Sequence, residues 1–353
     1  MAQGSKAMTE AAGTLTISLD FELFWGVHDT RSLQNYGDNI LGARAAIPRL
    51  LDLFARYEIG CTWATVGFLF FDDKEDLLSH VPDERPDYAN PALSPYRLIP
   101  DIGAGERADP YHYGLSLIRL INDCPGQEIG THTFSHYYCL EDGPTLESFR
   151  TDLLAAQRAA GRLGITLRSL VLPRNQASAP HLRICRELGI EAYRGNERSW
   201  IYRARSRRAE SLLRRGGRLA DSYVPITGPN CLRPIRDASG MVDIPSSCFL
   251  RPVSRQRRAL EGLRLRRIRN SMTHAALTGT VYHLWFHPHN FGADTDANLS
   301  FLGSILEHFQ RLREHHGMRS RSMAQIATEL GPEPSRASLA ERLEPAGALA
   351  GRS

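Results

Sequence analysis

The feature that most constrains the fold is a set of apolar, strand-like runs that each end in polar side chains. Four such runs occur, and the residues that follow them are Asp20 and Glu22, His132 and His136, Arg174 and Asn175, and His287 and His289. Segments with helical spacing of apolar residues separate the runs, which is the βαβ pattern of a parallel sheet. Because the carboxyl ends of parallel strands share one face, the sequence predicts a single site built from all four clusters.

Length and composition fit a large α/β domain. The chain has 353 residues, 42% of them hydrophobic and 23% charged, and a net charge of +4. This mild charge does not favour a nucleic acid partner. No apolar run is long enough to span a membrane. The six cysteines form no C-x-x-C pair and the opening residues show no apolar leader, so a soluble cytoplasmic protein with reduced thiols is expected.

Periodicity predicts the order of the elements. We expect a strand over residues 14–20 and another over 61–66, with a loop over 27–41 and a helix over 43–57 between them. Further strands are predicted at 169–172, 190–193 and 281–286, and further helices at 146–163, 180–189, 298–313 and 322–330. Residues 81–110 contain six prolines and are predicted to form an irregular insertion that shapes the substrate site.

The two histidines after the strand-like segment 128–131 have the spacing of a metal pair. His132 and His136 are four residues apart, so in a helical turn their side chains would share one face. Neutral histidine is the commonest metal ligand. Two unrelated polar histidines would give the same pattern, so the metal reading needs a third ligand.

The paired acids at the end of the first strand can supply that ligand. Asp20 and Glu22 are two residues apart, so in a continuing strand they face the same way. Their neighbours Leu19, Phe21 and Leu23 are apolar. An isolated carboxylate in such surroundings is costly unless it is paired or binds a metal.

These motifs resemble the polysaccharide deacetylases, carbohydrate esterase family four, of the NodB-homology type. The segment Gly126 to His136 (GQEIGTHTFSH) resembles the second motif of that family, Thr16 to Glu22 the first, and Leu284 to Pro288 the last. The resemblance covers about residues 14–330. It implies an α/β fold, a distorted (β/α) barrel of about seven parallel strands. This gives one catalytic domain, residues 14–332, between disordered segments 1–13 and 333–353.

The resemblance also implies roles for individual residues. Glu22, His132 and His136 would bind one divalent metal ion, with zinc expected, Asp20 would be the base, and His287 the general acid. The form Asp20-Phe21-Glu22 replaces the usual adjacent acids, so the two acids could exchange roles. Arg174 would hold Asp20 by an ion pair, although its motif departs from the usual one. His289 could replace or orient His287, and the residues predicted to contact substrate are Trp25, Asn175, His289 and Asn290.

The expected reaction is removal of an acetyl or other acyl group from the nitrogen of an amino sugar. Two arginine-rich stretches, residues 203–218 and 251–269, could contact phosphate on a nucleotide- or lipid-linked substrate, or a membrane surface, or could simply be solvated helix faces. A hydrolase of a non-sugar amide, a glycoside hydrolase using the acids, and a non-catalytic glycan-binding protein remain alternatives. Asp221 is a weak candidate for the Asp-containing fourth motif, against the alternative of a surface acid.

Overall fold

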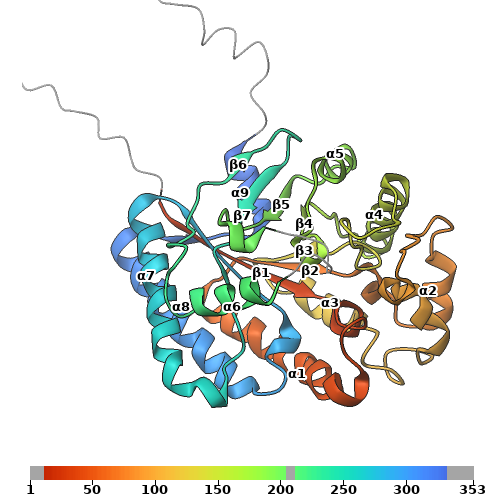
Figure 1. Cartoon of the computed structure of the whole chain (residues 1–353), viewed down its shortest axis with the longest axis horizontal. Coiled ribbons are helices and arrows are strands. Elements are labelled where there is room, and N and C mark those ends of the chain that lie inside the picture. The colour runs from red at the N-terminus through yellow and green to blue at the C-terminus, as the bar shows by residue number, and fades with distance from the viewer. Residues whose placement is uncertain (1–11, 204–210, 332–353) are drawn as a thin grey trace, which may run out of the picture.

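A ten-stranded sheet runs through the residues that the computed structural model describes, 12–203 and 211–331. It curls into a barrel, with helices packed around its outer face (Figure 1). The strand order is β6-β7-β5-β4-β3-β2-β1-β9-β8, and β10 also pairs with β1. The strands are β1 (Thr14–Phe21), β2 (Cys61–Thr65), β3 (Gln127–Thr131), β4 (Ser169–Leu170), β5 (Ala192–Gly195), β6 (Ile235–Arg236), β7 (Val242–Pro245), β8 (Cys248–Phe249), β9 (Val281–Phe286) and β10 (Arg319–Ser320).

One short stretch of chain closes the barrel. β7 pairs in parallel with β5, and β8, which follows after Ser246 and Ser247, pairs in parallel with β9. Taken as one interrupted strand, β7 and β8 complete a ring with β1, β2, β3, β4, β5 and β9. The only antiparallel pairing among these named strands is that of β6 with β7. The prediction of a single-domain, distorted (β/α) barrel of about seven parallel strands is confirmed.

The helices alternate with the strands as the sequence pattern indicated. They are α1 (Leu33–Tyr57), α2 (Lys74–His80), α3 (Leu115–Asn122), α4 (Leu146–Gly161), α5 (Ala179–Glu187), α6 (Leu212–Asp221), α7 (Glu261–Thr278), α8 (Thr295–His316) and α9 (Met323–Leu330). The prediction of a loop over 27–41 is wrong in its second half, because α1 begins at Leu33. A capping box of Ser32 and Asn35 starts the helix there, so local hydrogen bonds outweigh the low helical propensity of this segment.

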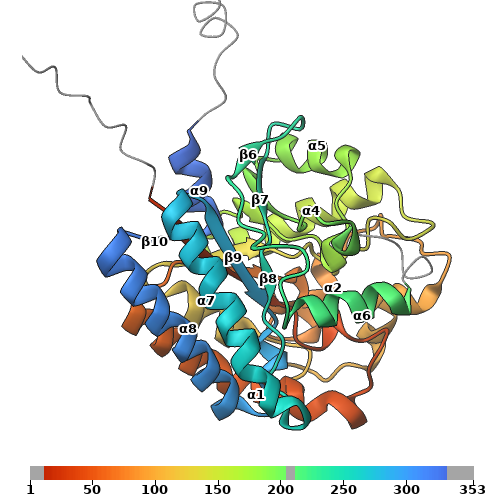
Figure 2. The same ribbon diagram turned by 60° about the vertical axis from the view of Figure 1, so that its left-hand side comes forward.

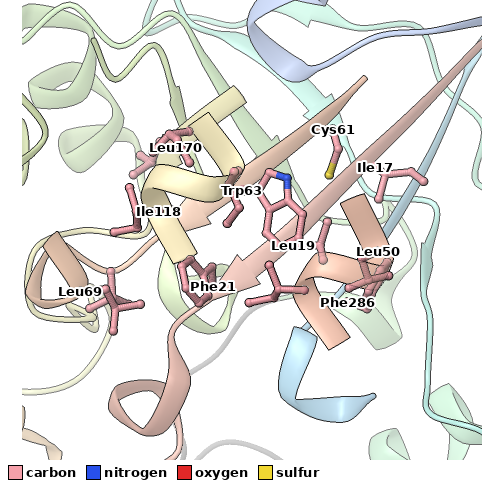
Figure 3. Close-up of a cluster of buried hydrophobic side chains, with 14 of the residues drawn as sticks. Ile17, Leu19, Phe21, Leu50, Cys61, Trp63, Leu69, Ile118, Leu170 and Phe286 are labelled. Atoms are coloured by element: carbon pink, nitrogen blue, oxygen red, sulfur yellow. The ribbon is translucent and has the colours of Figure 1, made fainter. Parts of the chain in front are cut away.

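Strand β1 has no solvent-facing side, and its two faces differ in chemistry. Ile17, Leu19 and Phe21 point outward into the apolar layer shared with the helices, where they meet Trp63 of β2 (Figure 3). The alternate residues, including Ser18 and Asp20, are also buried and face the barrel interior. The period of two residues thus delivers polar groups to the inside of the barrel.

The predicted insertion over 81–110 contains only two 3-10 turns, Pro91–Leu93 and Pro95–Asp101, as regular structure. Its end is tied to α1 by an ion pair between Glu106 and Arg44. All six cysteines are free. Among the described helices, none has the length and apolar character needed to cross a bilayer. The predicted disordered segments fall outside the described residues, apart from Ala12 and Gly13.

Candidate active site

Asp20 sits in the barrel interior, where an arginine of another strand pairs with it. Arg194 of β5 donates to both carboxylate oxygens, with N–O distances of 2.6 and 2.8 Å. Arg194 also donates to the Ser18 hydroxyl at 3.0 Å, and its guanidinium stacks over the Trp285 ring at 4.1 Å. Both partners of the ion pair are almost completely buried. This fork geometry fixes the position and the charge of Asp20.

The predicted ion pair between Arg174 and Asp20 is therefore wrong. Arg174 pairs instead with Asp29 and, at 3.4 Å, with Glu141, and it stacks over the Tyr138 ring. The reason is topological. β4 ends at residue 170, so Arg174 lies in the turn beyond the strand, with a left-handed φ of 54°. Arg194 lies inside its strand, and its side chain enters the barrel.

Asn175 also has a role that differs from the predicted one. Its side-chain oxygen accepts hydrogen bonds from Arg194 at 2.9 and 3.2 Å. It thus helps to hold the arginine that holds Asp20, which makes it a positioning residue in this structure. A contact with substrate stays a prediction.

Glu22 lies within reach of both histidines of the 132–136 pair. One of its carboxylate oxygens is 3.3 Å from Nε2 of His132 and 3.0 Å from Nε2 of His136. All three residues are buried, and their donor atoms lie within 4.8 Å of one another. Two ligands about 2.05 Å from a tetrahedral ion are about 3.3 Å apart. The three side chains therefore fit the coordination sphere of one divalent ion.

The hydrogen bonds behind the histidines agree with that arrangement. Nδ1 of His132 is 2.8 Å from the Val171 carbonyl, so it carries the proton and leaves Nε2 free to coordinate. Nδ1 of His136 is 3.2 Å from the Tyr138 hydroxyl. Partners of this kind orient metal-binding imidazoles.

The histidine pair lies in an irregular loop and not in a helical turn. Thr133 and His136 both have left-handed backbones, with φ of 65° and 55°. The buried carboxyl of Asp152, on α4, holds the loop by accepting from the backbone N–H groups of Phe134 at 2.7 Å and Ser135 at 3.1 Å. Burial raises the pKa of Asp152 to about 7, although these donors oppose the rise. No local sequence pattern distinguishes this aspartate from the other acids of a helix.

A glycine makes room for the carboxylate of Glu22. The 3-10 turn Leu23–Gly26 follows directly after Glu22 and folds back over it. A Cβ atom on Gly26 would lie 1.9 Å from the Glu22 carboxyl carbon. Only glycine therefore allows this turn and this carboxylate position together.

Two further histidines approach the acids from β9. Nε2 of His287 is 3.6 Å from Asp20 and 3.7 Å from Glu22. Nε2 of His289 is 3.9 Å from the same Glu22 oxygen. The His287 side chain is 21% exposed, whereas that of His289 is 5% exposed. Burial and the neighbouring His287 lower the pKa of His289 to about 3, so His289 is neutral near pH 7.

Asn290 supports the first of these rings. Its side-chain nitrogen is 3.3 Å from Nδ1 of His287, and its oxygen accepts from the Tyr36 hydroxyl at 3.4 Å. Nδ1 of His287 is therefore held by Asn290, and its Nε2 points toward Asp20 and Glu22.

Both acids are kept ionised by their surroundings. Burial alone would raise the pKa of Asp20, but Arg194, His132 and His287 together lower it below its ordinary value of 3.8. Burial likewise opposes ionisation of Glu22, and the histidines around it still hold its pKa well below 4.5. A neutral acid of the kind that protonates a glycosidic oxygen needs a raised pKa, so neither carboxyl suits that role.

Two residues singled out in the sequence are buried in structural contacts. Trp25 is completely buried, and its indole N–H donates to the His112 carbonyl at 2.7 Å. The prediction that Trp25 contacts substrate is therefore wrong, because its ring is part of the core. Asp221 is buried and pairs with Arg267 at 2.7 Å, so the alternative of a surface acid is wrong. A role of Asp221 as the acid of the fourth motif stays a prediction.

Comparison with known proteins supports the fold. No family model matches the sequence, and no curated protein does. Two similar solved structures are assigned as polysaccharide deacetylases. The one from Mycobacterium smegmatis has 13% identity and a TM-score of 0.56, and the alignment covers 100% of this chain and 99% of that one. The one from Pseudomonas aeruginosa PAO1 also has 13% identity and a TM-score of 0.56, over 90% and 91% of the two chains.

A third similar structure is the Puue allantoinase, with 12% identity, a TM-score of 0.54 and coverage of 91% of each chain. At sequence identities this low, the similarity shows that the helices and strands are arranged alike, and it does not show a shared reaction. The barrel closed by β7 and β8, with its polar side chains at the carboxyl ends of β1, β3, β5 and β9, thus has the fold of the NodB-type polysaccharide deacetylases.

Proposed function

We propose that this protein is a metal-dependent N-deacetylase that removes an acetyl or other small acyl group from an amino sugar. One observation carries the proposal. The Asp20–Arg194 pair, the Glu22–His132–His136 group and the His287 ring meet at one place, with distances of 2.6 to 3.7 Å between neighbouring groups. Base, metal ligands and acid are the three parts that amide hydrolysis of this type needs.

The residues divide the chemistry as follows. A divalent ion held by Glu22, His132 and His136 would supply an acidified water and polarise the amide carbonyl; zinc suits this donor set and its spacing. Asp20, ionised and fixed by Arg194, takes the proton of the attacking water. His287 gives a proton to the departing nitrogen, because its free Nε2 faces the acids and its ring is partly exposed. His289 is buried and neutral, so it suits support of His287 better than proton donation.

The substrate is proposed to be a nucleotide- or lipid-linked acetamido sugar, used in a cytoplasmic step of surface glycan synthesis. Arginine is abundant in the segments that follow β5 and β8, at the same ends of the strands as the site, and arginine suits phosphate. A hydrolase of a non-sugar amide is the second candidate, because the Puue allantoinase has a similar fold and the base, metal ligands and acid proposed here would also suit that reaction.

The test combines metal analysis with product release. Purified protein should hold one zinc equivalent and should release acetate from nucleotide-linked acetamido sugars. His136→Ala should lose both the metal and the activity, whereas His181→Ala, which removes another buried histidine, should keep the metal. Conversion of allantoin to its ring-opened ureido acid, with no acetate from any sugar, would replace the first candidate by the second. Sugar binding without turnover at full metal loading would favour a glycan-binding protein.

A further inference from the structure

Helix α6 buries two charged side chains and exposes two leucines. Arg214 and Asp221 are the buried residues of this helix. Leu212 and Leu213, in contrast, are 81% and 80% exposed. A surface helix of a globular protein normally buries its apolar stripe, so this helix has the opposite orientation.

Buried polar contacts hold α6 in that orientation. Asp221 accepts from Arg267 of α7, from the Tyr202 hydroxyl and from the backbone N–H of Thr227, each at 2.7 Å. Arg214 donates to the carbonyls of Trp200 and Arg203. Turning the leucines inward would break the Asp221–Arg267 pair and leave buried charges without partners, which is costly. The outward apolar face is thus fixed by the fold.

The apolar face continues onto the neighbouring segments. Trp200, Val224, Ile226 and Leu263 are each more than 40% exposed, with Ile226 at 64%. A groove of about 420 Å³ lies between the segment 223–229 and α7, and Arg266 and His274 are among its lining residues. We refer to Trp200, Leu212, Leu213, Val224, Ile226 and Leu263 as the α6 surface.

The charge around the α6 surface is positive. Arg215, Arg257, Arg258 and Arg266 are exposed. In the described parts of the segments 198–236 and 251–274, the acids are Asp221, which is buried and pairs with Arg267, and Glu261, which pairs with Arg264. A second copy of the chain meeting this face across a two-fold axis would place arginine against arginine. An anionic lipid surface matches both the apolar and the basic groups.

The α6 surface lies beside the active site. The segment with Trp200 and α6 follows the carboxyl end of β5, which carries Arg194, and the arginine segment 255–260 follows β8. Figure 2 shows α6 on the outside of the molecule, near the end of β8. Phe249 of β8 contacts residues of both regions. Its ring lies 5.7 Å from the His287 ring, and the Arg251 guanidinium lies 5.6 Å from the centre of the Phe249 ring.

We infer that the α6 surface docks on an anionic lipid bilayer, with Leu212 and Leu213 inserted among the headgroups and the arginines on the lipid phosphates. The inference rests on the proposed function in one respect: it selects the lipid-linked form of the amino sugar as substrate, since docking brings the site to the bilayer. A basic surface with apolar side chains at its centre is the pattern of peripheral membrane binding.

The test measures binding to vesicles without any reaction. The full-length protein should co-sediment with phosphatidylcholine vesicles containing about 30% phosphatidylglycerol, should bind pure phosphatidylcholine at least about tenfold more weakly, and should be released as salt rises. The double substitution Leu212→Glu and Leu213→Glu should reduce partitioning at least about tenfold. Leu78→Glu, which changes a half-exposed leucine on α2, is the matched control and should bind as the wild type does.

Thermal unfolding and sedimentation velocity of each variant separate docking from misfolding and from self-association. Unchanged vesicle binding by the folded double variant would overturn the inference. So would a wild-type dimer that becomes monomeric in the double variant and ignores vesicles. Asp20→Asn keeps the α6 surface, so it should bind vesicles as the wild type does while releasing acetate on the order of a thousandfold more slowly. Vesicle binding and acetate release can therefore fail independently, which keeps this inference distinguishable from the proposed function.

Discussion

The molecule has one arginine–carboxylate pair inside the barrel and another nearer its mouth. The burial of the arginine distinguishes the pair that holds the base from the pair that supports the structure. Arg194 and Asp20 have side chains only 1% and 5% exposed and share two hydrogen bonds. The Arg174 side chain is 25% exposed and is shared by Asp29 and Glu141, whose side chains are 1% and 9% exposed. A bidentate pair with a buried arginine fixes one carboxylate in charge and direction, whereas a partly exposed arginine shared by two acids fixes neither as strictly. The pair with the buried arginine therefore marks the base.

Exchanging the two aspartates for asparagine tests that comparison most severely. Asp20→Asn removes the base and should lower kcat on the order of a thousandfold. Asp29→Asn changes the corresponding acid of the outer pair and should retain most of the activity. Steady-state acetate release measures both. Equal losses of activity in the two variants would show that burial of the paired arginine does not identify the base.

The arginines provide the next largest contrast. Arg194→Lys keeps the charge and loses the fork, so kcat should fall about tenfold to a hundredfold. Arg174→Lys should change kcat by no more than about fivefold, because its ion pairs are partly exposed and shared. The same kinetic assay applies, with metal content checked in each variant. A larger loss in Arg174→Lys would restore the role that the sequence suggested for it.

A glycine substitution separates the metal site from overall stability. Gly26→Ala puts a methyl group where the Glu22 carboxylate lies, so zinc affinity should fall about tenfold to a hundredfold. The free energy of unfolding of the metal-free protein should change by less than about 1 kcal/mol, since a side-chain end can move aside. Competition with a zinc chelator and urea unfolding measure the two quantities. Gly303→Ala, with no atom within 4 Å of its new Cβ, is the control and should leave zinc affinity unchanged.

The smallest effect concerns pH and a histidine outside the site. Burial lowers the pKa of His181 from 6.5 to about 4. His181 in the unfolded chain therefore becomes protonated as the pH falls through 6.5, whereas in the folded chain it becomes protonated only near pH 4. Stability from this residue is complete above pH 6.5 and is lost as the pH falls toward 4, at up to about 1.4 kcal/mol per pH unit. Urea unfolding of His181→Leu should show a shallower slope in this window, and an unchanged slope would contradict the assignment.

The barrel and three of the four polar clusters could be predicted from the sequence, because periodicity reveals the strands and the clusters follow the strand ends. Strand β9 and the helices α4 and α9 have strong periodicity and matched the structure within a few residues. His132, His136, Glu22 and His287 follow strand ends, so topology alone brings them together.

Arg194 lies one residue beyond the predicted end of its strand, Tyr193, so the sequence does not mark it as a site residue. Arg174 also follows an apolar strand-like run, and that pattern favoured it instead. Asp152 and Gly26 act through contacts across the fold, which no local pattern reports. Helix α1 begins earlier than predicted, because glycine and asparagine near its start lower helical propensity, whereas its capping box stabilises the first turn through local hydrogen bonds.

The position of β1 has a consequence for how the chain reaches its native state. This strand precedes the other described strands in the sequence and pairs on one side with β9, and the Ser18 hydroxyl contacts His283, 265 residues later. One edge of β1 therefore stays without its native partner until β9 has been synthesised. Contacts so distant in sequence slow folding and expose strand edges to aggregation. We expect this protein to depend on chaperones during synthesis and to tolerate C-terminal truncation poorly once β9 is reached.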